Sequence, residues 1–509
     1  MRTAKLLPWI SAALAGAVLA GSCTTKVLPV LRLAVGSPHR GGTLRVLLTD
    51  DVDSLDPHRA ARPSSWFFVR ALHRGLLGFP DEPFPAGARP VPDLADGMPT
   101  VDLGGRRYTF HLRAARFSDG TTITSADVMS SLARALRIDR GDARYLWVIE
   151  GAGAYALGNA PTVSGISTPD ARTIVITLVR ASPDLPWVLA HPQFAVVPGS
   201  TPVRAQQTAI VGAGPYRLQS YDPEQSIVLV RNPRWSDDSL RAANVDMIHA
   251  SIGDTQQQAV DAVGANDADV IAEPGPPDTT PQIPPNARAG AGVGTCLRYL
   301  FANGVGAPAR AAIASAVDPA RFASEDAVGA TSALAPAVFG GTVEVPPRAH
   351  VRASFTITAG DSPRDRNDVA VLVRMLAAAG IALSPRFVPP AVLYNVVYPP
   401  PARGVQLGIA TSCADWPGMA GRAMLDPLLG VTVPAPAPGC RSAAVIRKRA
   451  LAAASGDAAA WTGVAAALPA CGVVPLYWPV ERSALSSRLG GFTGSPMFPR
   501  GDATNLWVG

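Results

Sequence analysis

The segment Arg107–Val128 constrains the fold of this chain more than any other part of the sequence. Its first residues alternate between apolar and polar side chains, with Tyr108, Phe110 and Leu112 on one side, which is the pattern of a half-buried β-strand. A Ser-Asp-Gly turn follows, in which Gly120 can adopt a positive φ. The segment therefore predicts a strand that turns sharply into the next element.

That next element is predicted to be a helix with a capping box at its N-terminus. Thr124 precedes Asp127 by three residues, a spacing at which each side chain can satisfy a backbone N–H of the first turn. Val128, Leu132 and Leu136 then recur at the spacing of one buried helix face. A strand followed directly by an amphipathic helix is typical of α/β domains.

Strands alternate with helices through the whole chain, which predicts the α/β fold class. Gly41–Leu48 (GGTLRVLL) predicts a strand, and Asp53–Pro57 predicts the loop after it. Gly212–Trp235 predicts a β-hairpin, and Ala370–Leu383 predicts a helix followed by a strand. With 509 residues, the chain is long enough for about three domain-sized units.

Charge and motif content exclude several function classes. The 45 basic and 39 acidic residues nearly balance, and no basic run is interleaved with aromatic residues, so we expect no nucleic-acid partner. The chain has no G-x-S-x-G or H-E-x-x-H motif, and the Gly-x-Gly at Gly212–Gly214 opens a hairpin rather than a helix. We therefore predict that the protein is not an enzyme.

The N-terminus has the pattern of an export signal. Arg2 and Lys5 precede the apolar run Leu6–Leu19, which is shorter than the roughly 18 residues of a membrane-spanning helix. Small residues lead directly to Cys23, as in the bacterial lipobox, although Ala20 stands where leucine is usual. We predict a signal peptide over residues 1–22, a lipidated Cys23 and a tether over residues 23–40.

This processing would anchor the protein on the outer face of the cell membrane, in the periplasmic space. A soluble secreted protein and an uncleaved anchor are the alternatives. Four cysteines remain in an exported chain, which suggests two disulfides with three possible pairings: Cys296, Cys413, Cys440 and Cys471. The cysteines lack C-x-x-C spacing and the seven histidines are scattered, so we expect neither a metal site nor a cofactor.

The segments described above resemble a known family of binding proteins. RYTFHLRAARFSDGTTITSADV and GAGPYRL are similar to the two most specific blocks of the bacterial extracellular solute-binding proteins of family 5. This family comprises the oligopeptide-, dipeptide- and nickel-binding components of ABC importers. Weaker similarities, such as SLDP and GVVPLYWP, extend the resemblance from Gly41 to the C-terminus, with departures at Arg74, Gln406 and Gly418.

The resemblance implies a two-lobed periplasmic-binding-protein fold of type II, with the ligand cleft between the lobes. Lobe I, including an extra subdomain, is expected over residues 41–250. Lobe II is expected over residues 251–478, with a return to lobe I over residues 479–509. The two crossovers between the lobes would then lie near residues 250 and 478.

The function implied is capture of a short peptide or peptide-like solute by a monomeric protein, which hands it to the permease and ATPase subunits of an importer. One alternative is another solute on the same scaffold, such as a nickel chelate, haem or an oligosaccharide. A second alternative is a regulatory lipoprotein that has lost transport, which the departures from the family pattern would suit.

The resemblance also implies the site residues. In oligopeptide-binding members, a similar Cys-Ala-Asp-aromatic segment places its aspartate on the peptide's α-ammonium, a role that falls here to Asp415, with an Asx turn as the alternative. Trp416 would form an apolar wall of the cleft or pack in the core. Tyr477 and Trp478 are expected to pack at the hinge rather than to contact ligand.

The family also implies a disulfide pairing. In some oligopeptide-binding members, cysteines at the places of Cys296 and Cys413 are bonded to each other. Cys440 and Cys471 would then form the second pair, also within the second lobe.

Overall fold

The computed structural model describes residues 37–509 except for thirteen short internal gaps, which are 139–141, 204–209, 237–239, 273–282, 325, 331, 335–349, 390–391, 399–403, 419–420, 431–439, 441 and 456. The predicted signal peptide, Cys23 and most of the predicted tether lie outside the described residues. In the part that is described, none of the helices has both the length and the apolar character needed to cross a membrane.

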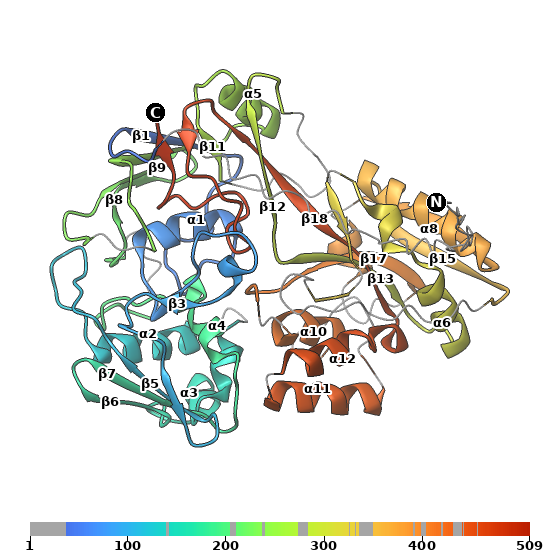
Figure 1. Ribbon diagram of the computed structural model, residues 1–509, viewed down its shortest axis with the longest axis horizontal. Helices are drawn as coiled ribbons and strands as arrows, with labels where there is room; N and C mark the ends of the chain where they lie inside the picture. The colour runs from blue at the N-terminus through green and yellow to red at the C-terminus, as the bar shows by residue number, and fades with distance from the viewer. Residues whose placement is uncertain are drawn as a thin grey trace, which may run out of the picture.

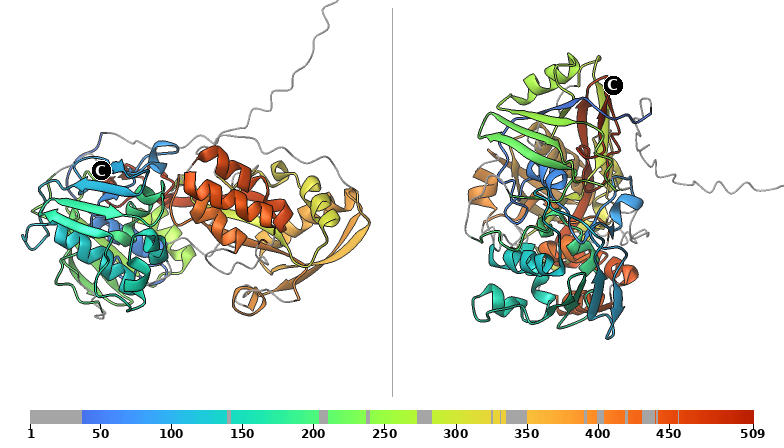
Figure 2. Two further views of the ribbon diagram at one scale, coloured as in Figure 1. Left: turned by 90° about the horizontal axis from the view of Figure 1, so that it is seen from below. Right: turned by 90° about the vertical axis from the view of Figure 1, so that its left-hand side faces the viewer.

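Two lobes are joined by β-strands that run between them (Figure 1). We define lobe I as residues 41–293 and 480–509, and lobe II as residues 296–479. Seen from below, lobe I and lobe II lie side by side (Figure 2). The strand β18 (Val473–Leu485) belongs to both lobes.

The elements of lobe I are, in chain order, β1 (Thr43–Leu48), α1 (Pro63–Leu72), β2 (Leu77–Gly78), η1 (Ala86–Ala88), β3 (Val91–Pro92), β4 (Thr100–Asp102), β5 (Arg107–His111), α2 (Ser125–Ile138), η2 (Asp142–Val148), α3 (Ala152–Ala156), β6 (Ile166–Asp170), β7 (Thr173–Thr177), α4 (Leu185–Leu189), η3 (Pro192–Phe194), β8 (Tyr216–Asp222), β9 (Ser226–Arg231), β10 (Met247–Ile252), α5 (Gln256–Gly264), β11 (Val270–Ile271), β12 (Arg288–Val293), β19 (Leu489–Gly490) and β20 (Trp507–Val508).

The elements of lobe II are β13 (Cys296–Ala302), α6 (Ala307–Ala316), η4 (Pro319–Phe322), β14 (Ala327–Gly329), β15 (Ala353–Gly360), α8 (Pro363–Ala378), β16 (Ile381–Val388), η5 (Leu393–Val397), β17 (Leu407–Cys413), α10 (Gly421–Leu429), α11 (Ala443–Ser455), α12 (Ala458–Ala465) and η6 (Leu468–Cys471).

The strand, the turn and the helix of Arg107–Val128 form as the sequence predicts, but only the Asp127 half of the capping box does, because the backbone N–H of Asp127 bonds the carbonyl of Thr124 and not its hydroxyl. β5 buries Tyr108 and Phe110, and it lies inside a four-stranded sheet of order β4-β5-β7-β6. The carboxylate of Asp127 accepts hydrogen bonds from the backbone N–H and the hydroxyl of Thr124, at 2.9 and 2.8 Å. Helix α2 then packs against this sheet, and the unit is the extra subdomain of lobe I (Figure 1).

One sheet of twelve strands passes through both lobes, in the order β16-β15-β17-β13-β18-β11-β1-β10-β9-β8, with β12 and β14 also paired to β18. The first part of β18 pairs with lobe II, where Pro479 lies opposite Ala327. The second part pairs with lobe I, where Val480 lies opposite Val293. The chain therefore passes between the lobes within β18, at residues 479 and 480.

The other crossing lies later in the chain than expected. β11 pairs with β1, and α5 packs its buried face on Leu47 and Ala484 of lobe I. These contacts keep residues 251–272 in lobe I, because the apolar face of α5 is buried against lobe I. The connection to lobe II follows β12 at Gly294 and Thr295, so the lobe boundary expected at residue 250 falls too early.

Candidate functional site

The two residues expected to bind ligand lie at the turn that follows β17. β17 pairs with β13 so that Cys413 lies opposite Cys296, and the two cysteines are bonded. Asp415 is half-buried at this turn, whereas Trp416 is 1% exposed. The turn therefore starts from a strand end that is fixed both by a ladder of hydrogen bonds and by a disulfide.

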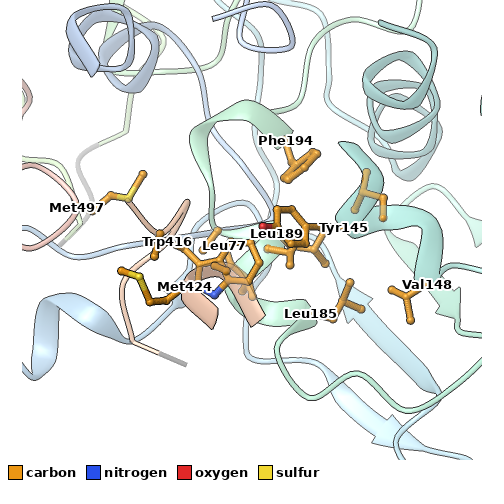
Figure 3. Close-up of a cluster of buried hydrophobic side chains, with 14 of the residues drawn as sticks. Leu77, Tyr145, Val148, Leu185, Leu189, Phe194, Trp416, Met424 and Met497 are labelled. Carbon is orange, nitrogen blue, oxygen red and sulfur yellow. The ribbon is translucent and has the colours of Figure 1, made fainter. Parts of the chain in front are cut away.

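Trp416 lies where the two lobes touch. Its ring meets the ring of Tyr145 from lobe I edge to face, with centroids 4.6 Å apart (Figure 3). Around this pair, apolar side chains from both lobes form a single buried cluster, which includes Leu77, Val148, Leu185, Leu189, Phe194, Met424 and Met497. An aromatic pair of this geometry adds about 0.5–1.5 kcal/mol beyond the area that it buries.

Gly418 allows the lobes to approach backbone to backbone. Its φ is +85°, and a Cβ at this position would lie 2.1 Å from the carbonyl oxygen of Ala88 and 2.5 Å from Nε1 of Trp187. That indole donates a hydrogen bond of 2.9 Å to the same carbonyl of Ala88. Both the backbone conformation and the close approach thus require glycine here.

A buried ion pair also joins the lobes. Nε of Arg422, on α10, lies 2.7 Å from Oδ2 of Asp184, and the side chains are 8% and 11% exposed. The hydroxyl of Ser182 donates to the other carboxylate oxygen at 2.7 Å, and the guanidinium lies 5.2 Å from the ring centroid of Tyr145. Sequence reasoning missed this pair, because no local pattern links two residues so far apart in the chain.

A small cavity of about 20 Å³ opens beside this contact, next to the strands that cross between the lobes. Lobe I contributes Phe84, the connection after β12 contributes Gly294 and Thr295, and lobe II contributes the other described lining residues. The lobe II side chains that line it include Trp416, Pro417, Met424 and Trp478. The cavity thus lies directly beside the turn that carries Asp415.

The departures from the family pattern have structural roles. Arg74 is buried, with Nε 2.6 Å from Oδ1 of Asp93 and its guanidinium over the ring of Trp235. The side-chain oxygen of Gln406 accepts a hydrogen bond of 2.8 Å from the backbone N–H of Thr356. Neither side chain is among those that line the cavity at the crossing strands.

The four described cysteines form the two disulfides that the resemblance implied. Cys296 is bonded to Cys413, and Cys440 is bonded to Cys471, which ties the segment before α11 to η6. Among the residues that the structure describes, no three His, Cys, Asp or Glu side chains are grouped so as to hold a metal ion.

A family model described as "Bacterial extracellular solute-binding proteins, family 5 Middle" matches residues 89–347. The chain belongs to this family. It is 30% identical over 205 residues to the periplasmic oligopeptide-binding protein OppA of Salmonella typhimurium, covering 38% of this chain and 36% of that one. It is 25% identical over 232 residues to the dipeptide-binding protein DppE of Bacillus subtilis, covering 43% and 41%. The matched part thus spans less than half of each of these relatives.

Solved structures share the fold over nearly the whole chain. Clavulanic acid biosynthesis oligopeptide binding protein 2 superposes with a TM-score of 0.77 at 23% identity, over 93% of this chain and 96% of that one. The unliganded open form of the murein tripeptide binding protein MppA gives 0.71 at 17% identity, over 92% and 98%. At these identities the likeness shows the fold, which is the two-lobed fold of the periplasmic binding proteins.

Proposed function

We propose that this protein captures a short peptide or a peptide-like solute between its lobes and delivers it to the permease of an ABC importer. The observation that supports this most directly is the position of the Asp415–Trp416 turn. It projects from a disulfide-bonded strand end to the place where the lobes meet, beside a cavity lined by both lobes and by the crossing connection.

Asp415 would hold the α-ammonium of the peptide. Closing lobes strip water from that charge, and a buried ammonium without a partner costs several kcal/mol, so a carboxylate at this turn serves the task. Backbone hydrogen bonds along an extended peptide would add affinity that does not depend on its side chains. The lobes would part and close about the crossings at Gly294–Thr295 and at Pro479–Val480, which is a hinge motion.

Calorimetry with trialanine tests the role of Asp415. We expect Asp415→Asn to weaken binding by roughly 2–5 kcal/mol, and N-acetyl-trialanine to bind the wild-type protein poorly, because each change leaves one charge of the pair without its partner. Asp361→Asn is the matched control, since Asp361 is a carboxylate of lobe II that pairs with Arg366 at the surface. Equal affinity for the free and the acetylated peptide would remove Asp415 from the site.

A lipid anchor on Cys23 would hold the monomeric protein to the outer face of the cell membrane, next to the permease and ATPase subunits. Mass spectrometry of detergent-extracted protein should find a diacylglyceryl group on an N-terminal Cys23. Mature protein that starts at another residue and is recovered from the medium would contradict the anchor without affecting the solute site.

A further inference from the structure

The cavity at the crossing strands has a composition that selects for one kind of chemical group. The side chains that line it include those of Phe84, Thr295, Trp416, Pro417, Met424 and Trp478. Among the described residues that line the cavity none carries a charge, and their polar side-chain groups are the hydroxyl of Thr295 and the indole N–H groups of Trp416 and Trp478. A charged group placed here would lose its water without gaining a partner, whereas an apolar group would be stabilised by burial.

Trp478 carries a hydrogen-bond donor that is not used in this structure. Its side chain is 3% exposed, and Nε1 has no hydrogen-bond partner within the described residues. Buried indole N–H groups normally find an acceptor, as Nε1 of Trp187 does with the carbonyl of Ala88. An unpaired donor on a residue that lines a cavity is a group that a bound solute could satisfy once the lobes move, and only an acceptor atom could do so, because an indole N–H cannot accept.

The location of Trp478 connects this donor with the proposed site. It lies on β18, next to Pro479, where the strand passes from one lobe to the other. The residues that line the cavity also include Ala414 and Trp416, the two neighbours of Asp415 in the chain. A solute held by its ammonium at Asp415 would thus have its adjacent group beside the indole of Trp478.

We infer that this cavity is a specificity subsite, in which the indole N–H of Trp478 donates to a carbonyl of the solute while the apolar walls take an uncharged apolar side chain next to the ammonium end. The inference rests on the proposed function and deepens it, because it names the class of ligand: peptides with an apolar residue near the N-terminus. The cavity has room for about one water molecule in this structure, so a side chain enters while the lobes are further apart.

The test compares three proteins by calorimetry: the wild type, Trp478→Phe, and Trp235→Phe as a matched control. Trp235 also has an indole nitrogen without a partner, but it lies in lobe I against Arg74 and Arg241 and does not line this cavity. The probes are trialanine variants with leucine, lysine or glutamate at the first or the second position.

At one of these two positions, we expect leucine to bind the wild type at least about tenfold more tightly than lysine or glutamate. We expect Trp478→Phe to weaken binding of that leucine peptide about three- to tenfold, the worth of one hydrogen bond, and Trp235→Phe to leave it unchanged. Equal affinity for charged and apolar peptides at both positions, or unchanged affinity in Trp478→Phe, would overturn the subsite while leaving peptide capture intact.

A measurement on the free protein separates this inference from the proposed function. In the ¹⁵N–¹H spectrum, the indole signal that disappears in Trp478→Phe should lie upfield of the signal that disappears in Trp187→Phe, because the Trp187 group is hydrogen-bonded. It should move downfield when the leucine peptide is added. A Trp478 signal already at the hydrogen-bonded position would overturn the inference, whether or not a peptide binds. Failure of every peptide to bind would by itself remove only the proposed function.

Discussion

At the scale of single residues, Trp416 and Gly418 determine how closely the two lobes approach each other. The strand end before Asp415 could be recognised from its pattern and from the family resemblance. The contact of Trp416 with Tyr145 could not, because it depends on how the two lobes close. Gly418 is the clearest case. The sequence shows only a departure from the family pattern, whereas in the structure the backbone of Gly418 packs directly against the backbone of Ala88.

We expect Gly418→Ala to hinder closure of the lobes. The added Cβ would collide with the carbonyl of Ala88, which cannot move as a flexible side chain would, and alanine is also strained at a φ of +85°. Small-angle scattering should show a larger radius of gyration, and trialanine should bind about tenfold or more weakly, since roughly 1.4 kcal/mol corresponds to a factor of ten. Gly463→Ala, on a helix with open space around it, is the control. A radius unchanged from the wild type would contradict this role.

A second prediction at this scale concerns Asp81. Burial, together with the nearby charge of Asp502, raises the pKa of Asp81 to about 7 from an ordinary value of 3.8. The folded state therefore binds a proton more tightly than the unfolded state does. The stability that this proton contributes is fully present below about pH 4 and is lost as the pH rises through about 7.

Asp81→Asn mimics the protonated side chain and keeps an oxygen that can accept from the hydroxyl of Thr493. We expect the free energy of unfolding of the variant to exceed that of the wild type by about 1–2 kcal/mol at pH 5, where the unfolded carboxylate is already ionised, and by roughly 3–4 kcal/mol at pH 8.5. Urea denaturation at both pH values measures this difference. Burial lowers the pKa of His58, His73 and His191, and these side chains contribute equally to both proteins. A difference that is the same at both pH values would therefore show that Asp81 does not titrate in this range.

At the scale of elements, the disulfide between β13 and β17 fixes the strand end that presents Asp415. A link across 117 residues is worth about 4–5 kcal/mol by chain entropy, against about 3–4 kcal/mol for the 31 residues between Cys440 and Cys471. We expect a Cys296→Ala/Cys413→Ala variant to lose both stability and affinity for trialanine. Cys440→Ala/Cys471→Ala should lose stability with little loss of affinity, and equal losses of affinity in the two variants would contradict this division of roles.

The ion pair between Arg422 on α10 and Asp184, the residue before α4, is expected to favour the closed arrangement of the lobes. Arg422→Met leaves the carboxylate of Asp184 without its cation, and removing one partner of a buried pair costs about 3–5 kcal/mol. Because this penalty applies only while the lobes are closed, the variant should populate more open forms. Fluorescence energy transfer between dyes on the two lobes measures this change.

Arg500→Met is the control for this experiment, since it breaks a pair of 3.0 Å with Glu481 inside lobe I. It should lower the melting temperature without changing the distance between the dyes. An unchanged distance in Arg422→Met would mean that the apolar cluster around Trp416 holds the lobes together without the ion pair.

At the scale of the whole molecule, the alternation of strands and helices was enough to predict the α/β class, and the order of motifs was enough to predict the family. The path between the lobes was harder, because the parallel pairing of β11 with β1 joins segments far apart in the chain. A strand of two residues such as β11 leaves almost no pattern of its own. The first crossing was therefore placed before α5, whose apolar face in fact completes lobe I.

The path of β18 also affects how the protein folds during its synthesis. This strand lies between β13 and β11 in the large sheet, yet it begins only at Val473, later in the chain than both of them. Until it arrives, β11, β12 and β13 all expose edges that lack their partner, and such edges invite pairing with other chains. Neither lobe can complete its part of the sheet until the chain has been synthesised through Leu485, so we expect these edges to need protection from pairing with other chains during translation.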